Sequence, residues 1–421
     1  MHKLKMPDVL PFRALHYNQE KIKDIQSVVA PPYDIISNSM QDELYNKSQY
    51  NIVRIILGKI LKDDTEKDNR YTRAKNFLSE WMKNKILVYD NSATFYIYEQ
   101  SFEINNTKKK LSAFIGICRI EDFENGNIKP HERTFKAPIK DRLMLMHECM
   151  ANPEPIYCLY SNPKVTDAIK ESNKDVLFDF NENTKKHVLS RIQDNYTIER
   201  ISKEMIDTPI YIADGHHRYQ TALEFSREMQ RGNKSIMPYN YIMMLLADIQ
   251  DDSIIILPTH RVIQKKVQID FDKVKQFFDV IELGNDPNAL LRGLEKNKEL
   301  HSIGLSIANQ YYIIVLKDIE LITKYAQKNK KSILWNSLDV SILDNIIIQD
   351  ILGMENYDDN DIIYTRDCNV AIRLSSKGVA FLLKPPKIEE VKKIADMKET
   401  MPHKSTYFYP KPLSGLVLYK F

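Results

Sequence analysis

The chain has 421 residues, with 60 basic and 57 acidic side chains and a formal net charge of +3. This length suggests two or three domains and is ample for buried cores. A balance so close to neutrality argues against the positive field that nucleic-acid-binding proteins carry, so we expect no nucleic-acid partner.

The N-terminal segment and the cysteines indicate where the protein works. The N-terminus lacks the long apolar core of a signal peptide, and no stretch of about 18 apolar residues is present, so we expect no membrane-spanning helix. The four cysteines form no CxxC pair, which is typical of a reducing compartment. We therefore expect a cytoplasmic protein.

In the first 250 residues, a proline-marked extended segment (1–40) precedes alternating helices and strands. The predicted helices are 39–60, 67–86, a segment that begins at Lys140, and a helical, solvent-rich region that begins at 167. The predicted strands are 93–104, 108–121, 155–160 and 210–213, of which the first two form a hairpin.

Beyond residue 250, apolar runs again predict both kinds of element. The predicted strands are 254–258, 310–316 and 378–383, and the predicted helices are 271–278, 286–297 and 338–352. A domain boundary near 250 is expected, because residues 248–252 are acidic and polar. We expect an N-terminal α+β region at 1–110, a core at 111–250 and a C-terminal α+β domain at 251–421.

The segment PIYIADGHHRYQTAL, residues 209–223, carries the strongest chemical signal. It predicts a strand, a polar turn and a helix whose free backbone N–H groups would bind an anion, phosphate above all. Gly215 permits close backbone approach, and Arg218 offers a planar bidentate donor. His216 and His217 add donors or could transfer protons. Asp214 could cap the helix, hold a histidine or ligate a cation.

A second polar cluster is PHERTFKAPIKDR, residues 130–142. Glu132, flanked by His131 and Arg133, could act as a general base if the fold removes it from water. The side chains that could bind phosphate oxygens are Arg133, Thr134, Lys140 and Arg142. The alternative is an exposed charged loop without a catalytic role.

Three shorter stretches are candidates for substrate contacts. VVAPPYD, residues 28–34, either fixes the direction of the chain or delivers Tyr33 and Asp34 to a site. LPTHR places His260 and Arg261 after an apolar run, where α/β sites tend to form. KSTYFYPK could meet phosphate through Lys404, Ser405 and Thr406, with Tyr407 and Tyr409 as walls.

The common catalytic signatures are absent from the sequence. It contains no GxxxxGK[ST] phosphate loop, no protein-kinase motif set, no HExxH and no GxSxG. If the chain handles phosphate, it does so on an unusual scaffold.

Together, VVAPPYD, HERTFKAP, ADGHHRYQTA and the later THR resemble a widespread, mostly uncharacterised bacterial family known as a domain of unknown function. The order of the His-Glu and Asp-Gly-His-His-Arg motifs also resembles the ParB/sulfiredoxin-like fold. This resemblance implies an α+β fold with a ParB/sulfiredoxin-like core at 111–250 and additional α/β regions on both sides. In that superfamily, the glycine-arginine turn binds a nucleotide or phosphate.

Free-serine kinases of this fold use a glutamate that follows a histidine as the base on the serine hydroxyl. By resemblance, Glu132 is the base, with Asp214 and His216 in the catalytic set, and residues 214–218 are the phosphate cradle. The implied reaction converts L-serine to O-phospho-L-serine, with pyrophosphate, ATP or ADP as donor. We favour pyrophosphate, because no glycine-rich adenine-binding stretch is readable and the motifs are basic. Mg²⁺, with Asp214 as a ligand, would bridge the donor oxygens.

Two other functions fit parts of the sequence. A ParB-like nucleotide-binding regulator would need a basic pair of DNA-binding helices, and the near-neutral charge argues against it. A phosphohydrolase or nuclease could use the same anion site with water in place of serine.

Overall fold

The computed structural model describes residues 8–104, 106–232, 235–265, 267–354 and 361–421. The chain divides into two compact units, Met1–Ile255 with Pro410–Phe421 and Ile256–Tyr409. The expected regions 1–110 and 111–250 both fall within the first unit. The expected domain at 251–421 is divided, because its last residues return to the first unit.

The first unit is built on a nine-stranded mixed sheet with the order β6-β11-β8-β12-β5-β4-β10-β9, to which β1 is added beside β5. The pairs β11/β6 and β12/β8 are parallel, and the other pairs are antiparallel. The strands are β1 Val9–Leu10, β4 Tyr96–Ile104, β5 Thr107–Arg119, β6 Ile128–Lys129, β8 Ile156–Tyr160, β9 Lys174–Glu182, β10 Lys185–Ile192, β11 Ile210–Asp214 and β12 Tyr241–Asp248.

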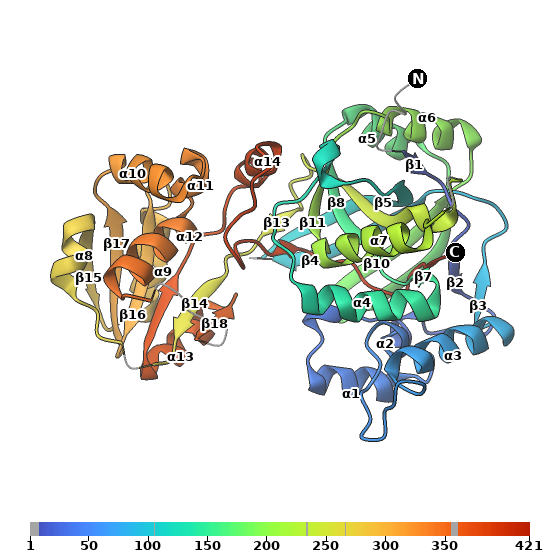
Figure 1. Ribbon diagram of the computed structural model, residues 1–421, viewed down its shortest axis with the longest axis horizontal. Coiled ribbons are helices and arrows are strands. Elements are labelled where there is room, and N and C mark those ends of the chain that lie inside the picture. Colours follow the sequence, from blue (N-terminus) through green and yellow to red (C-terminus); the bar gives the residue numbers. More distant parts are fainter. Residues whose placement is uncertain (1–7, 105, 233–234, 266, 355–360) are drawn as a thin grey trace. The chain divides into compact units, whose positions relative to one another are not determined.

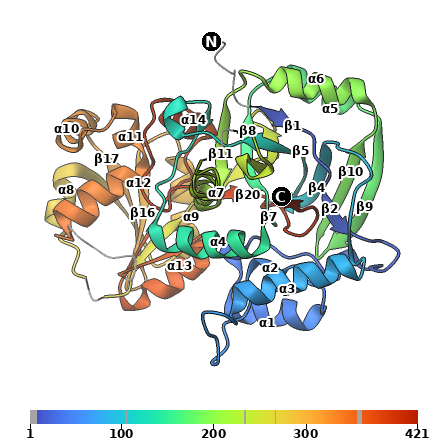
Figure 2. The ribbon, with the colours of Figure 1, turned by 45° about the vertical axis from the view of Figure 1, so that its right-hand side comes forward.

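Helices pack against this sheet through their apolar faces. Both ribbon views place α4 beside α7, and α5 beside α6 (Figures 1 and 2). Tyr219, Ala222 and Phe225 of α7 belong to the central apolar core. The helices are α1 Asn38–Lys47, α2 Val53–Ile56, α3 Arg70–Lys83, α4 Lys136–Cys149, α5 Pro163–Glu171, α6 Asn195–Met205 and α7 His216–Met229.

Three sequence expectations for the first unit were wrong in detail. The helix expected at 39–60 is broken, because the buried side chain of Asn51 donates to the carbonyls of Ser27 and Val29 and fixes a turn before α2. Helix α4 begins at Lys136 and not at Lys140, since a proline is tolerated in a first helical turn. The helical region expected after 167 is interrupted by the β9–β10 hairpin.

The end of the chain is threaded into the first unit. Leu418 pairs with Leu15, and Ser414 pairs with Ala30, as isolated antiparallel bridges. Strand β21, Tyr419–Lys420, pairs with β7, Ala151–Asn152, while β2, Leu15–Tyr17, pairs with β3, Leu87–Tyr89. The residues just before Ser414 are thereby placed beside the N-terminal segment that contains Ala30.

The second unit contains a six-stranded antiparallel sheet with the order β15-β17-β16-β19-β14-β18. Helices α9 and α13 pack on one face, where Val262, Leu290, Ile313 and Leu382 form the core. The strands are β14 His260–Ile263, β15 Phe278–Gly284, β16 Ser302–Ile307, β17 Gln310–Leu316, β18 Ile362–Thr365 and β19 Val379–Leu382. The helices are α8 Phe271–Phe277, α9 Pro287–Lys296, α10 Glu320–Asn329, α11 Ile333–Ser337, α12 Asp339–Ile342, the π-helix η5 Leu343–Ile351, α13 Cys368–Leu374 and α14 Ile388–Asp396.

The helices expected at 271–278 and 286–297 and the strands at 310–316 and 378–383 are present in the second unit. The helix expected at 338–352 is present as α12 followed by η5. The buried strand expected at 254–258 was wrong, because only Ile255–Ile256 is extended and paired there. In the described part of the chain, no helix is long and apolar enough to cross a membrane. All four cysteines are free thiols.

Candidate active site

The ADGHHR turn connects β11 to α7 as the sequence predicted. Gly215 lies between them with a φ of +99°, in the left-handed region that favours glycine. A Cβ atom on this residue would also lie 2.9 Å from Nη2 of Arg218. No side-chain hydrogen bond caps α7, and the uncapped N-terminus of a helix is a common place for an anion to bind.

Asp214 pairs with two basic side chains and does not cap the helix. Its Oδ2 accepts a hydrogen bond of 3.0 Å from Nη2 of Arg218, and its Oδ1 accepts one from Nζ of Lys411. Burial raises the pKa of the Asp214 carboxyl, but the charges of Lys411 and Arg218 outweigh burial and leave this pKa below its ordinary value. Of the three roles expected for Asp214, capping is therefore wrong.

Arg218 is a buried, fixed cation. Its side chain is 10% exposed, and its Nη1 donates to the carbonyl oxygen of Pro155 at 2.6 Å. Both terminal nitrogens thus hold protein oxygens, one on the strand β8 side and one on Asp214. The guanidinium supplies positive charge behind the turn, and it is not a mobile arm.

Asp34 comes to the site from the N-terminal part of the chain, whereas Lys411 comes from the C-terminal part. Residues Tyr33–Ile35 form the short helix η2, and the backbone N–H of Tyr33 donates to Oε1 of buried Glu154 at 3.1 Å. Ser414 donates to the same oxygen at 2.9 Å, so Glu154 joins the N-terminal turn to the returning C-terminal segment. As a result, Nζ of Lys411 lies 3.9 Å from Oδ2 of Asp34.

The pKa values of Asp34 and Asp214 are shifted in opposite directions. Burial, with the nearby charge of Asp214, raises the pKa of Asp34, although its carboxyl retains 42% of its side-chain exposure. The pKa of Asp214 is lowered by its basic partners. Pairs of carboxyl groups whose pKa values are driven apart are typical of acid–base sites.

The two adjacent histidines hold the HERTF segment. Nε2 of His216 accepts from the backbone N–H of His131 at 3.2 Å, and Nε2 of His217 accepts from that of Phe135 at 3.0 Å. The rings of His131 and His216 meet edge to face with centroids 4.6 Å apart. Since an accepting Nε2 carries no proton, each of these two imidazoles bears its proton on Nδ1.

Nδ1 of His216 lies near Glu132. The distance from Nδ1 to Oε2 of Glu132 is 3.4 Å, an ion-pair contact without a hydrogen bond, and His216 is almost completely buried. The Glu132 side chain is 30% exposed, so a substrate can reach a carboxylate that lies beside a buried imidazole. A general base must be within reach of the proton that it accepts.

The other charged residues of the HERT segment are placed differently from one another. Arg133 and Lys140 are exposed and Thr134 is half-buried. Arg142 is buried, donating from Nε to Asp141 at 2.7 Å and from Nη1 to the carbonyl of Ile56 at 2.6 Å. Its guanidinium therefore holds protein oxygens and not the phosphate expected for it, whereas Arg133 and Lys140 remain candidates for that contact.

Tyr33 lies beneath this guanidinium, whose Cζ is 4.0 Å from the centroid of the tyrosine ring. Burial raises the pKa of Tyr33 to about 12, so its hydroxyl stays protonated at physiological pH. A protonated phenol can donate a hydrogen bond, which keeps Tyr33 available for the substrate contact that the sequence suggested.

Five residues that the sequence proposed as substrate contacts belong to the second unit: His260, Arg261, Lys404, Ser405 and Thr406. His260 is buried, and its Nδ1 accepts from the backbone N–H of Leu383 while its Nε2 lies 3.0 Å from the Cys368 sulfur. The cluster around Asp214 in the first unit is formed without these five residues.

Sequence reasoning missed Lys411 and Glu154. Lys411 ends the stretch KSTYFYPK, in which we singled out the first three residues and the two tyrosines. Glu154 lies between two prolines ahead of β8 and gives no signal in the sequence. Both become functional candidates only when Ser414 pairs with Ala30 and brings the two ends of the chain together.

The residues present do not form a preassembled metal centre. In the described ranges, no group of three or more His, Cys, Asp or Glu side chains is placed to hold a metal ion. Asp214, the metal ligand expected from the sequence, already has Lys411 on one oxygen and Arg218 on the other. Two cations on one carboxylate make it a poor ligand for Mg²⁺.

The chain belongs to the DUF1015 family, described as proteins of unknown function, whose model matches residues 9–341. No curated protein matches the sequence. Among solved structures, a free serine kinase in complex with AMP is 15% identical with a TM-score of 0.31, covering 67% of this chain and 84% of its own. A truncated SbnI from Staphylococcus aureus is 11% identical with a TM-score of 0.36, covering 72% and 86%. These TM-scores are too low to establish a shared fold.

Proposed function

We propose that the protein is a small-molecule phosphotransferase that phosphorylates the hydroxyl of free L-serine to give O-phospho-L-serine. The observation that carries this proposal is the partly exposed carboxylate of Glu132, which lies 3.4 Å from buried His216 at the start of α7, a helix without a side-chain cap. A base next to an anion-binding helix end suits phosphoryl transfer, which needs positioning and charge neutralisation more than covalent chemistry. A ParB/sulfiredoxin-like core is part of the same proposal.

In this mechanism the N–H groups of the first turn of α7 bind the phosphoryl group that is transferred. Glu132 accepts the proton of the serine hydroxyl as its oxygen forms the new P–O bond. The P–O bond to the leaving group breaks, and with pyrophosphate the leaving group is inorganic phosphate. Exposed Arg133 and Lys140 supply positive charge to the donor, while Lys411 and Arg218 keep Asp214 ionised without net negative charge.

Pyrophosphate remains the favoured donor, with ATP and ADP as alternatives. Mg²⁺ enters this proposal as part of the donor, because Asp214 is occupied by basic partners and Mg²⁺ commonly binds substrate phosphates with only one or two carboxylates. Asp34, with its exposed carboxyl and raised pKa, is the acidic group best placed to contact the substrate amine or to share the proton.

The test is phosphorus NMR of the purified protein with Mg²⁺ and L-serine, with pyrophosphate, ATP and ADP offered in separate samples. A phosphoserine resonance in one sample supports the proposal and identifies the donor. Release of phosphate that does not require serine would favour a phosphohydrolase. No reaction in any sample, together with salt-dependent DNA binding, would favour the nucleotide-binding regulator.

A further inference from the structure

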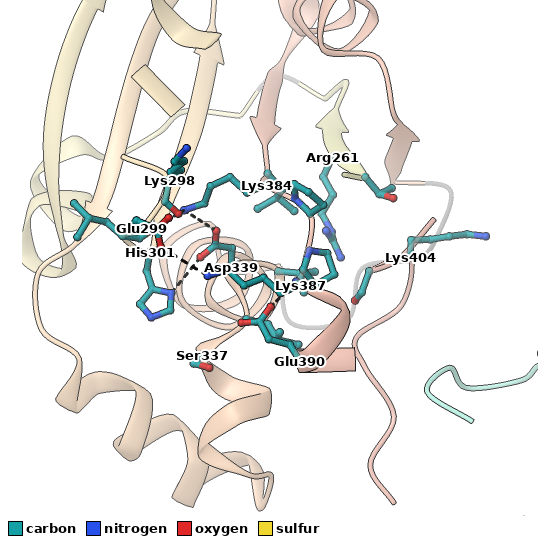
Figure 3. Close-up of a pocket in the computed structure, with 18 residues that line it drawn as sticks. Arg261, Lys298, Glu299, His301, Ser337, Asp339, Lys384, Lys387, Glu390 and Lys404 are labelled. Carbon is teal, nitrogen blue, oxygen red and sulfur yellow. Dashed lines mark hydrogen bonds and ion pairs between the residues drawn. The ribbon is translucent and has the colours of Figure 1, made fainter. Parts of the chain in front are cut away.

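The second unit contains a pocket of its own, with a volume of about 140 Å³ (Figure 3). It is lined by residues from the start of β14, the segment after α9, the α11–α12 junction and the segment after β19. An internal cavity of about 150 Å³ can hold a molecule the size of benzene. The pocket is therefore large enough for a compact ligand and too small for a nucleotide.

Arg261 is the most unusual side chain of this pocket. It alternates along β14 with Val262, which packs in the core under α9 and α13, so Arg261 lies on the opposite face of the sheet. Its side chain is 1% exposed, and its Nη2 donates to the carbonyl of His403 at 3.1 Å and to Asp344 at 3.4 Å. Figure 3 shows it reaching toward the middle of the pocket.

Two buried nitrogens of this guanidinium, Nε and Nη1, have no hydrogen-bond partner among the described residues. Nε lies 3.3 Å from Oδ1 of Asp344 as an ion pair, which leaves Nη1. Buried donors of charged groups are almost always satisfied by protein, water or ligand. The contrast with Nη2 and Nε, which face His403 and Asp344, indicates that Nη1 is held in place for an acceptor that comes from outside the chain.

The acidic side chains of the pocket are already satisfied. Asp339 is contacted by Nδ1 of His301 at 3.2 Å and by Nζ of Lys384 at 3.3 Å. Glu390 accepts from the backbone N–H of Lys387 at 2.7 Å. The lining includes more basic side chains than acidic ones: Arg261, Lys298, Lys384, Lys387 and Lys404 against Glu299, Asp339 and Glu390. The unsatisfied polar group, Nη1 of Arg261, is a hydrogen-bond donor, so an anionic ligand is favoured over a cation.

We propose that this pocket binds the phosphate group of a compact small molecule, with Arg261 Nη1 as the central donor and Lys387 at the rim. Arginine matches the tetrahedral oxygens of phosphate and retains its charge when buried. Lys404 does not contribute its ammonium group in this way, because its side chain extends away from the other labelled residues in Figure 3. Ser405 also lines the pocket, but its hydroxyl already donates to the carbonyl of Pro402.

Trp335 provides a reporter inside the second unit. The chain has two tryptophans, Trp81 in α3 and Trp335 in α11, and α11 ends at Ser337 of the pocket wall. Fluorine NMR of the full chain carrying 5-fluorotryptophan gives one signal for each, assigned with Trp335→Phe. Titration with inorganic phosphate should shift the Trp335 signal in a saturable way. Acetate at matched ionic strength should shift it much less, because one carboxylate carries less charge than phosphate.

Arg261→Lys keeps the charge next to Asp344 but removes the planar fork, and should weaken phosphate binding at least about tenfold. Arg366→Lys is the matched control, an exposed arginine of the same unit outside the pocket lining, and should leave binding unchanged. Lys387→Glu, at an exposed rim position, should weaken binding on the order of fivefold even if Arg261→Lys does not fold.

Three results would overturn the proposal: a Trp335 signal that does not respond to millimolar phosphate, equal responses to acetate and phosphate, or unchanged binding in both folded variants. The proposal does not depend on serine phosphorylation, since its reporter and its residues belong to the second unit. A response of Trp81 alone would assign phosphate to the first unit and would likewise count against the pocket.

Discussion

Arg218 in the first unit and Arg261 in the second are both buried arginines beside an aspartate, but their guanidinium groups are satisfied differently. Both terminal nitrogens of Arg218 donate to protein oxygens, whereas Nη1 of Arg261 has no acceptor in the described residues. A buried arginine next to a carboxylate is therefore not by itself a ligand site. The first is a fixed charge that shapes a catalytic cluster, and the second has a donor available for a ligand.

The two aspartates complete the contrast. Asp214 has a second basic partner in Lys411, contributed by the returning end of the chain. Asp344 faces Arg261 from the π-helix η5. The first unit thus arranges its charges around Glu132, whose side chain is 30% exposed, while the second arranges them around a pocket. We accordingly propose catalysis for the first unit and phosphate binding alone for the second.

Glu132→Gln gives the largest expected effect and tests whether catalysis belongs to the first unit. Loss of the base should lower kcat by about 10²–10⁴-fold, the usual contribution of general base catalysis. Donor affinity, measured by calorimetry, should stay within about twofold, because the anion-binding N–H groups are unchanged. The control is Glu199→Gln on the exposed face of α6, which should be as active as the wild type. An equal loss of donor binding would remove Glu132 as the base.

Lys411→Met removes one of the two basic partners of Asp214. The first unit then resembles the second, in which a buried ionic group also lacks one partner. Lys411 is 7% exposed and Asp214 is 18% exposed, so leaving this buried carboxylate with Arg218 but without Lys411 should cost about 3 kcal/mol of unfolding free energy. Urea unfolding measures this loss. Lys411→Arg should recover most of it, and Lys170→Met on exposed α5 should cost nothing measurable. Equal stability of Lys411→Met and Lys170→Met would contradict the paired cluster.

Arg218→Ala tests whether the fixed cation assists the phosphate cradle. The substitution leaves the charge of Asp214 less compensated beside the helix N-terminus, so donor binding should weaken by about 1.5–3 kcal/mol. Arg227→Ala serves as control, since Arg227 is an exposed residue of the same helix that pairs with Asp122. Unchanged donor affinity in a folded Arg218→Ala protein would exclude Arg218 from the cradle.

Acidification should release the HERTF segment with a smaller energetic effect. Burial, together with the unfavourable interaction that a protonated His131 would have with the neighbouring His216, lowers the pKa of His131 from an ordinary value of about 6.5 to about 3. The unfolded chain therefore binds more protons between these values, and stability falls as pH falls from about 6.5 toward 3. At pH 5 the loss amounts to about 2 kcal/mol for this residue.

His131→Gln should flatten this part of the pH dependence of urea unfolding, because it removes the titrating group and retains the backbone N–H that donates to His216. His147→Gln, which changes a half-exposed histidine, should leave the slope as in the wild type. If the His131→Gln and wild-type curves ran parallel from pH 7 to pH 4, the buried neutral state of His131 would be disproved.

Local patterns in the sequence predicted the strand-turn-helix at residues 210–229 and the hairpin of β4 and β5, because apolar periodicity and one glycine suffice for such units. The same reasoning extended the helix at 39–60 too far, since the buried contacts of Asn51 that break it come from residues distant in the sequence. Strands β14, β16 and β18 were missed because they are short and are defined by long-range pairing. Strand β14 pairs with β18, and β16 pairs with β19.

For the candidate site, the sequence by itself determined the candidate side chains: Glu132, the ADGHHR turn, Tyr33 and Asp34 were all recognisable from residue type and spacing. Only the tertiary structure decided their partners. The bridge between Ala30 and Ser414 places Lys411 on Asp214, and His216, which accepts from the backbone N–H of His131, lies 3.4 Å from Glu132. Local periodicity reports which face of an element is buried, whereas pairing between the two ends of the chain depends on long-range contacts that leave no periodic trace in the sequence.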